Sequence, residues 1–206
     1  MAKNALTRLL DGAEHLFYLE GIRAVGVAKV LEASGVGRAS FYRHFESKDD
    51  LVVAVLRRRD LAWRRWLAES VSRLARESQD RPLAVFDALA ERFAQADFRG
   101  CAFINSIVET ADRDAPAHAV ASEHKQLVIK YLDGLLAEGG WAHHRQLAPQ
   151  LALLIDGAIV TALREGSPKA ATRARSMARL LLAEPDCPAT GKPARMPAGR
   201  SARARR

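Results

Sequence analysis

Two short amphipathic segments separated by a glycine, within residues 26–57, constrain this chain more than any other feature of its sequence. Apolar residues from Val27 to Leu31 fall on one face of a helix, and Gly35 then interrupts the pattern. Glycine can adopt a positive φ without steric cost, which a tight turn between two helices requires. Phe41 and Phe45 resume the helical spacing at i, i+4. The sequence therefore predicts a helix-turn-helix, a geometry that can place its second helix in a groove of DNA.

The face of the second predicted helix opposite the two phenylalanines is polar and carries no acidic residue between Arg38 and Phe45. Guanidinium, hydroxyl and imidazole groups on such a face can reach phosphates and base edges. These groups belong to Arg38, Ser40, Tyr42, Arg43 and His44. A helical hairpin used only for packing is the alternative interpretation. The agreement of the glycine, the phenylalanines and the polar face favours DNA binding.

Two further helices are expected around this pair. Apolar residues recur at helical spacing over residues 6–17, and Gly21 provides a natural C-terminal stop. Ser47 precedes Asp50 by three residues, the spacing of a capping box, so another helix should begin at about Ser47. Because no Pro or Gly intervenes, that helix should continue towards Leu74.

Residues 35–51 follow the pattern G-V-x-x-x-S-F-Y-R-H-F-x-S-K-x-x-L and are preceded by a helix that ends in Ala33-Ser34. This segment resembles the DNA-binding segment of the TetR/AcrR family of bacterial repressors. The resemblance extends over roughly residues 6–56, and the remainder of the chain is similar to the family in its helical organisation. Two departures, Val25-Gly26 in place of a capping Thr/Ser pair and Leu31 in place of alanine, concern the helix cap and the packing rather than the motif.

The resemblance implies an all-α fold with an N-terminal three-helix DNA-binding module and a larger helical domain for ligand binding and dimerisation. We place the module in residues 1–46, the larger domain in residues 47–184 and a basic disordered tail in residues 185–206. The resemblance also implies a ligand-responsive transcriptional regulator, a repressor by family expectation, that is released from DNA by a small-molecule inducer. A homodimer would present two recognition helices to double-stranded operator DNA, so the operator should be palindromic.

The residues expected to bind DNA fall into three groups. Arginine can pair with guanine, and a small alanine fits against a thymine methyl group. The residues expected to face the bases are Arg38, Ala39, Ser40 and Arg43. Those expected to hold phosphates are Tyr42, His44 and Lys48. Those expected to approach the DNA backbone from the preceding helix are Gly26, Val27 and Lys29.

The formal net charge of +8 suggests a polyanionic partner, but its distribution weakens that inference. Residues 185–206 contain six basic residues and one acidic residue, so five of the eight net charges lie in the tail. The tail should add salt-sensitive attraction to DNA, or it is a solvated end without a role. Two cysteines do not make a disulfide scaffold, and the chain begins without a signal segment. The sequence therefore predicts a cytoplasmic protein with no membrane partner.

The rest of the chain is also predicted to be helical, with no strand. The expected helical segments are about 82–96, 101–111, 115–138, 145–165 and 168–184. Residues 151–163 are apolar on nearly all sides, so we expect them to pack against a partner subunit. Leu180 and Leu181 on the next helix should complete a four-helix seam between two chains. The alternative is burial within one monomer.

Large apolar residues on several of these helices are either plain core or the wall of a pocket. The resemblance implies a small, apolar ligand between the helices, with a few polar side chains to orient it. The residues expected to bind the ligand are Trp63, Phe86, Phe93, Phe103, Asn105, His124 and Tyr131.

Other chemistries have weaker support in the sequence. No G-x-S-x-G elbow and no recognisable Cys/His pair occur, so we expect no enzyme, with turnover of a bound compound kept as a remote alternative. The histidines lack metal-ligand spacing, and we expect neither a metal site nor a cofactor. Cys101 stands near a predicted helix N-terminus, where a thiolate is favoured. A redox or electrophile sensor acting through Cys101 is therefore the alternative function, although a buried, inert thiol explains the same residue.

Overall fold

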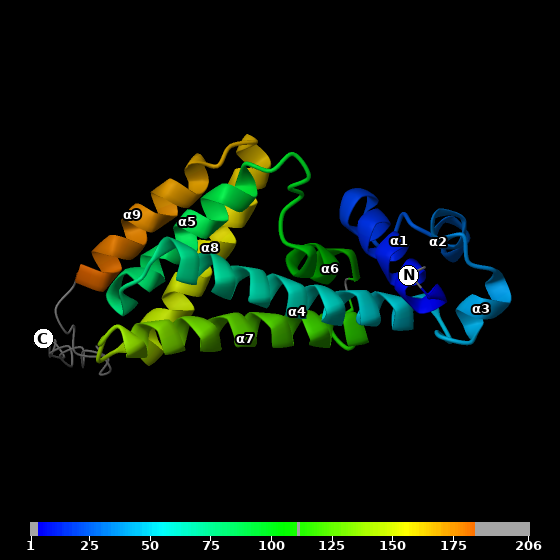
Figure 1. Ribbon diagram of the computed structural model, residues 1–206, viewed down its shortest axis with the longest axis horizontal. Coiled ribbons are helices and arrows are strands. Elements are labelled where there is room, and N and C mark those ends of the chain that lie inside the picture. The colour runs from blue at the N-terminus through cyan, green and yellow to red at the C-terminus, as the bar shows by residue number, and fades with distance from the viewer. Residues whose placement is uncertain (1–3, 111, 184–206) are drawn as a thin grey trace, which may run out of the picture.

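The computed structural model describes residues 4–110 and 112–183, and in these ranges the chain is helical and contains no strand. The predicted all-α fold is therefore confirmed. The N-terminal helices lie at one end of an elongated molecule, and the last two helices lie towards the other end (Figure 1). The elements are α1 (Ala5–Glu20), α2 (Val27–Ser34), α3 (Arg38–Tyr42), α4 (Lys48–Leu74), the 3-10 helix η1 (Ser78–Asp80), α5 (Arg81–Phe93), α6 (Ala102–Thr110), α7 (Pro116–Glu138), α8 (His144–Glu165) and α9 (Lys169–Ala183).

The first three helices have the local stop and start signals that the sequence indicated. Asn4 caps α1 by accepting a hydrogen bond from the Thr7 amide at 2.8 Å. Gly35 ends α2 with a φ of 60°, a left-handed conformation that residues with a Cβ rarely adopt. Ser47 and Asp50 form the reciprocal capping box that begins α4. The predicted beginning and end of α4 are both confirmed.

The helix after the glycine turn is shorter than the sequence pattern suggested. Regular helix ends at Tyr42, although the amide of Phe45 still donates to the carbonyl of Phe41 at 3.0 Å. Phe41 is fully buried and Phe45 nearly so, as the i, i+4 spacing required. The C-terminal turn therefore leaves helical geometry without exposing its aromatic anchor.

Two apolar cores stabilise the described chain. The first joins α1, α2, α3 and the first turns of α4, and it extends to Phe103 of α6 and to Val120 and Ala121 of α7. The second lies among α4, α5, α7, α8 and α9. Apolar burial contributes roughly 25 cal/mol for each Å² removed from water, so each core makes its helices mutually dependent. Because the first core includes α6 and α7, the N-terminal module is packed against the larger domain rather than suspended from a linker.

The long helices α4 and α7 pack side by side along the molecule (Figure 1). Helix α8 packs against α7 and α9, while α5 packs against α4 and α9. The later helices agree with the predicted segments to within three residues at either end, but η1 was not anticipated. The basic tail, residues 185–206, and its Cys187 lie outside the described residues.

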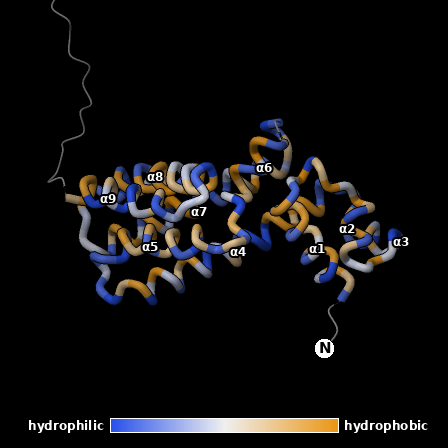
Figure 2. Tube along the Cα trace, turned by 90° about the horizontal axis from the view of Figure 1, so that it is seen from above, coloured by the Kyte–Doolittle hydropathy of each residue, from blue (hydrophilic) through white to orange (hydrophobic). Residues whose placement is uncertain are grey.

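Helices α8 and α9 keep large apolar side chains on the surface of the single chain. Apolar residues, orange in Figure 2, recur along both helices. The exposed members are Leu153, Val160 and Leu163 of α8 and Met177 and Leu180 of α9. By length and composition, α8 is also the one described helix that could cross a membrane. Its Leu151, Ile155 and Ile159 are buried in the second core, as expected for a core helix with one uncovered face.

Candidate DNA-binding surface and ligand cavity

The polar face predicted on the second helix of the motif lies on the surface. Arg38, Ala39, Tyr42, Arg43 and His44 are exposed, and Ser40 is half-buried. Phe41 lies beneath them, with its ring edge against the ring of Tyr42 at 5.1 Å between centroids. A fully buried aromatic ring thus fixes the orientation of a short, exposed polar surface.

The preceding helix reaches the same surface through its N-terminus. Gly26 is exposed and caps α2 without a side-chain hydrogen bond, so the missing Thr/Ser cap is a real feature of this chain. Val27 is half-buried against the core, and Lys29 is exposed and forms an ion pair with Glu20 of α1. Gly26 therefore leaves the first backbone amides of α2 without a side-chain partner, as a phosphate contact would require.

Lys48 has a structural contact that the sequence did not suggest. Its ammonium group donates to the carbonyl of Ile22, 2.5 Å away in the turn between α1 and α2. Lys48 is half-buried and joins the start of α4 to that turn. In this conformation the side chain positions the helices of the module, and only part of its surface is free to meet DNA.

A cavity, partly open to solvent, lies between α4, α5, α6, α7 and α8, and its empty space of about 530 Å³ includes some of that open solvent. The sequence-predicted residues that line it are Trp63, Phe93, Phe103 and His124. Tyr18 of α1, Cys101 and Phe98 also line it and were not predicted as ligand contacts.

Three residues predicted to bind the ligand lie elsewhere. Phe86 is fully buried in the second core and does not line the cavity. Asn105 lines a neighbouring pocket, where its amide donates to the Arg99 carbonyl at 3.1 Å. Tyr131 lines an outer groove between α4 and α7, and Trp63 contributes to the wall of that groove as well as to the cavity. The sequence identifies these residues as large or polar and places them on helices. It does not indicate which face of each helix lines the cavity.

His124 is the buried polar group of the cavity wall, with 3% of its surface exposed. Its ring stacks on Phe103 at 3.6 Å and meets Trp63 edge-on at 5.2 Å. Its Nδ1 lies 2.7 Å from Asp60 Oδ1, and Arg64 holds the same carboxylate through its Nε and Nη2 atoms. Asp60 and Arg64, both on α4, thus anchor a histidine of α7 by contacts that no local motif signals.

The charge states of this cluster follow from its burial and its partners. Burial lowers the pKa of His124 to about 4, and the hydrogen bond to Asp60 only partly opposes that effect. Burial alone would raise the pKa of Asp60, but hydrogen bonds from Arg64 and His124 outweigh it and hold the pKa below its ordinary value. Near neutral pH the cluster therefore comprises a carboxylate, a guanidinium and a neutral imidazole.

Tyr18 connects the N-terminal module to the wall of the cavity. Its hydroxyl accepts a hydrogen bond from the Arg99 amide at 2.8 Å and donates one to the Gly100 carbonyl at 3.1 Å. Arg59 of α4 lies over its ring, 4.0 Å from the centroid. The α5–α6 loop is therefore hydrogen-bonded to α1 immediately before Cys101.

A second contact joins α6 to the turn after α1. Glu109 accepts a hydrogen bond from the Arg23 amide at 2.9 Å. Its carboxylate also lies close to Gly21, where a Cβ would come within 3.0 Å of it and φ is 92°. Both ends of α6 thus contact the N-terminal module.

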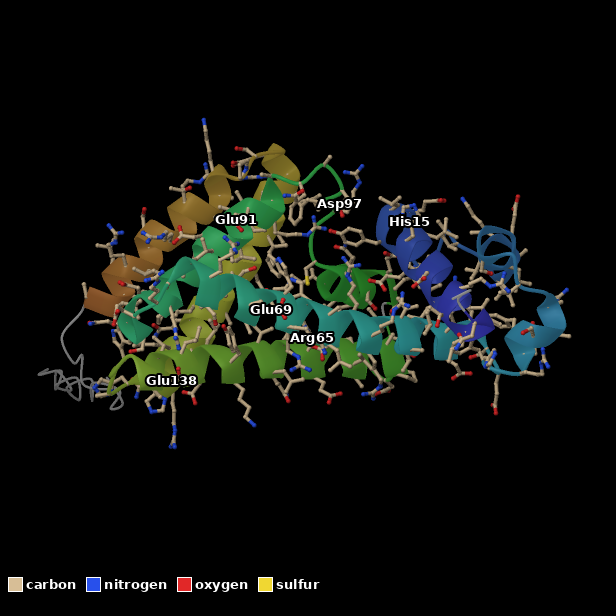
Figure 3. The ribbon with its side chains drawn as sticks, viewed as in Figure 1. His15, Arg65, Glu69, Glu91, Asp97 and Glu138 are labelled. Carbon is tan, nitrogen blue, oxygen red and sulfur yellow. The ribbon has the colours of Figure 1, made fainter. Side chains whose placement is uncertain are left out.

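Ionised side chains surround the space between α1 and the α5–α6 loop. Asp97, on that loop, and His15, on α1, lie on either side of this cleft (Figure 3). Within it Arg58 pairs with Asp11 and Glu14 across the α1–α4 interface. In the described residues, no three His, Cys, Asp or Glu side chains gather as a metal site.

Comparison with known proteins identifies relatives for both parts of the chain. Residues 9–55 match the family model described as bacterial regulatory proteins, tetR family. A solved TetR-family transcriptional regulator from Streptomyces coelicolor is 30% identical, with a TM-score of 0.78 over 86% of this chain and 94% of that one.

Curated transcriptional regulators are more distant relatives. The transcriptional repressor NemR of Escherichia coli is 27% identical over 66% of this chain and 68% of its own length. The crystal structure of its reduced form superposes with a TM-score of 0.76 at 24% identity, covering 86% of this chain and 96% of NemR, a likeness of fold. The transcriptional regulator TtgR of Pseudomonas putida is 28% identical over 62% of this chain and 64% of its own length.

Proposed function

Because this chain belongs to the TetR family of bacterial transcriptional regulators, we propose that it is a cytoplasmic repressor that binds palindromic operator DNA as a homodimer. A small molecule in the cavity beside His124 would release it. One observation carries the proposal: an exposed polar helix and a cavity are joined by direct contacts between α1 and the cavity wall. No catalytic step is proposed.

The DNA-binding part of the proposal is supported by the geometry around α3. Arg38 and Arg43 are exposed and free of ion pairs with the described residues, so their guanidinium groups are available to base edges. Tyr42 is 50% exposed, which supports the proposed phosphate contact of its hydroxyl. We assign Lys48 a mixed role, because it also positions the turn at Ile22.

The proposed homodimer is supported by the uncovered apolar surface of α8 and α9. Leu153 is 74% exposed and Leu180 is 70% exposed in the single chain. Exposed apolar side chains grouped on two neighbouring helices are typical of a surface that a partner covers. A two-fold axis through this surface would give both subunits the same contacts and would present two α3 helices to one operator.

Release would operate through α6 and the loop before it. A ligand changes DNA affinity only if it binds more tightly to a conformation that binds DNA less well. The cavity is lined by Cys101, Ala102 and Phe103 at the start of α6, and the preceding Gly100 carbonyl is bonded to Tyr18 of α1. A ligand that displaces this segment must therefore disturb α1, which braces the helix-turn-helix pair.

The DNA-binding assignment is tested by alanine variants of the exposed face. Arg43→Ala is expected to weaken operator binding by about tenfold or more and to relax base preference, because a guanidinium contact with a base is lost. Tyr42→Ala and Lys48→Ala should both weaken binding to all sequences, and Lys48→Ala, which removes a charge, should also reduce its salt dependence. Fluorescence anisotropy against matched and scrambled duplexes measures both effects.

Arg65→Ala is the matched control, because Arg65 lies on α4 away from the module (Figure 3). Its operator affinity should equal that of the unmodified protein. Unchanged operator affinity in all three test variants would reject the assignment of α3.

The coupling route is tested by Tyr18→Phe, which removes the hydroxyl while keeping the ring under Arg59. Operator affinity should change little. The factor by which a releasing compound lowers that affinity should fall at least about fivefold, because the hydroxyl's two hydrogen bonds to the α5–α6 loop are lost and each contributes about 1 kcal/mol. That factor is the ratio of operator dissociation constants with and without the compound.

Tyr131→Phe, the same change in the outer groove, should leave the factor unaltered. An unaltered factor in Tyr18→Phe as well would exclude the hydroxyl from the coupling route.

A second candidate function uses the same cavity through Cys101. This thiol is half-buried, unpaired, and part of the cavity wall where α6 begins. Its addition to an activated alkene would form a thioether, with the thiol proton transferred to the adjacent carbon of the alkene. Operator release that coincides with this mass increase on Cys101 would favour the sensor, while release by unreactive compounds favours the reversible ligand.

A further inference from the structure

The hydrogen bonding of His124 determines which of its ring atoms can meet a ligand. Arg64 holds the Asp60 carboxylate with Nε at 2.9 Å from Oδ1 and Nη2 at 2.7 Å from Oδ2. An ionised carboxylate can only accept hydrogen bonds. Nδ1 of His124, 2.7 Å from Oδ1, must therefore carry the ring proton and donate it. In the neutral imidazole this leaves Nε2 as a bare acceptor.

Nε2 of His124 has no hydrogen-bond partner among the described residues, although the ring is 3% exposed. It also does not belong to the fully enclosed unpaired atoms, which are Arg81 Nε and Ser106 Oγ in the described chain. The atom therefore keeps some accessible surface, which we assign to the cavity that the ring lines. An acceptor on a cavity wall that has no protein partner favours a ligand that donates a hydrogen bond to it.

The cations at the cavity wall already have anionic partners. Arg59 pairs with Glu14 at 3.1 Å, Arg92 with Asp97 at 2.5 Å, and Lys125 with Asp156 at 2.5 Å. An anionic ligand would have to displace one of these carboxylates to gain a charge partner. The remaining wall is largely apolar, and the rings of Trp63, Phe93, Phe98 and Phe103 lie in it beside aliphatic side chains such as Ile155. This surface favours a flat, uncharged molecule.

We propose that the cavity binds an uncharged aromatic compound bearing an O–H or N–H group, which it donates to Nε2 of His124. This inference rests on the proposed function only in taking the cavity as the ligand site. The low pKa of His124, about 4 because of burial, keeps the acceptor unprotonated across the neutral range. Asp60 and Arg64 act as positioning residues, since they set the tautomer without lining the cavity.

A matched pair of probes tests the donor requirement. 4-Propylphenol carries a hydroxyl donor, and 4-propylanisole has the same ring and chain with that donor methylated. Isothermal titration of the full-length protein, without DNA, should give about tenfold tighter binding of the phenol. Equal affinities, tighter binding of the anisole, or binding of neither probe would overturn the proposal.

His124→Phe identifies the acceptor, because it keeps an aromatic ring against Phe103 and leaves Asp60 paired with Arg64. The preference for the phenol should disappear, while the affinity for the anisole stays within about twofold. A preference that survives in this variant would contradict the assignment to His124.

Nitrogen NMR of the unmodified protein gives a second measurement that does not depend on the variant folding. The Nε2 resonance of His124 should start at the position of an unprotonated nitrogen and shift upfield when the phenol, but not the anisole, is added. A resonance that ignores the phenol would also overturn the proposal.

Operator binding without any probe is measured separately. Its absence would refute the proposed repressor function and leave the ligand chemistry standing. Loss of the phenol preference with operator binding intact would refute the ligand chemistry alone.

Discussion

Replacement of Leu153 and Leu180 by glutamate in one variant is expected to convert the dimer into a monomer and to weaken operator binding by roughly a hundredfold or more. Both leucines are at least 70% exposed in the single chain, on α8 and α9. Two facing copies of this surface would bury the new carboxylates where apolar side chains otherwise meet, so association becomes unfavourable. A monomer loses the advantage of binding two half-sites at once. Light scattering during size exclusion gives the mass, and fluorescence anisotropy gives the affinity.

Leu61→Glu is the matched control, because Leu61 is 61% exposed on α4, outside the proposed seam. It should remain dimeric and bind the operator normally. A double variant that stays dimeric would place the interface elsewhere. A monomeric variant with full operator affinity would show that dimerisation does not contribute to DNA binding.

The sequence predicted the local structure of this chain well because local structure depends on short-range signals. Gly35, and the Ser47–Asp50 capping box, act within a single turn, and both have the predicted geometry. The spacing of Phe41 and Phe45 likewise identified the buried side of the motif. Regular helix nevertheless ends at Tyr42, earlier than this spacing suggested, and the Phe45 amide bond to Phe41 together with the burial of Phe45 holds the final turn.

The cavity was only partly predictable because it depends on contacts between distant segments. Asp60 and His124 are separated by 64 positions, and Tyr18 and Gly100 by 82, so no spacing rule connects them. Periodicity also cannot distinguish Phe86, which fills the core, from Phe93, which lines the cavity on the same helix. Lys48 shows the same limit at the DNA-binding surface, since its bond to Ile22 requires the folded turn.

The buried imidazole also makes stability depend on pH. In the unfolded chain His124 takes up a proton near its ordinary pKa of 6.5, whereas in the folded protein burial lowers the pKa to about 4. Between these values the unfolded state binds more protons, so the free energy of unfolding falls as the pH falls. One pKa unit corresponds to about 1.4 kcal/mol. Between about pH 7 and about pH 4.5 the unmodified protein should therefore lose roughly 2–3 kcal/mol through this group.

His124→Phe should lack this component, so the two proteins should differ in the slope of stability against pH over that interval. Urea unfolding at a series of pH values, monitored by circular dichroism, measures it. Asp60 does not add to this slope, because its pKa is held below 3.8. The stability that its ionised form provides is lost only under more acid conditions. His15→Gln removes a histidine from the exposed side of α1 and should retain the slope of the unmodified protein (Figure 3). Parallel curves for the unmodified protein and His124→Phe would mean that the imidazole takes up a proton as readily in the folded state as in the unfolded state. Below its ordinary pKa of 6.5, Nε2 would then be a donor instead of the acceptor that the ligand requires.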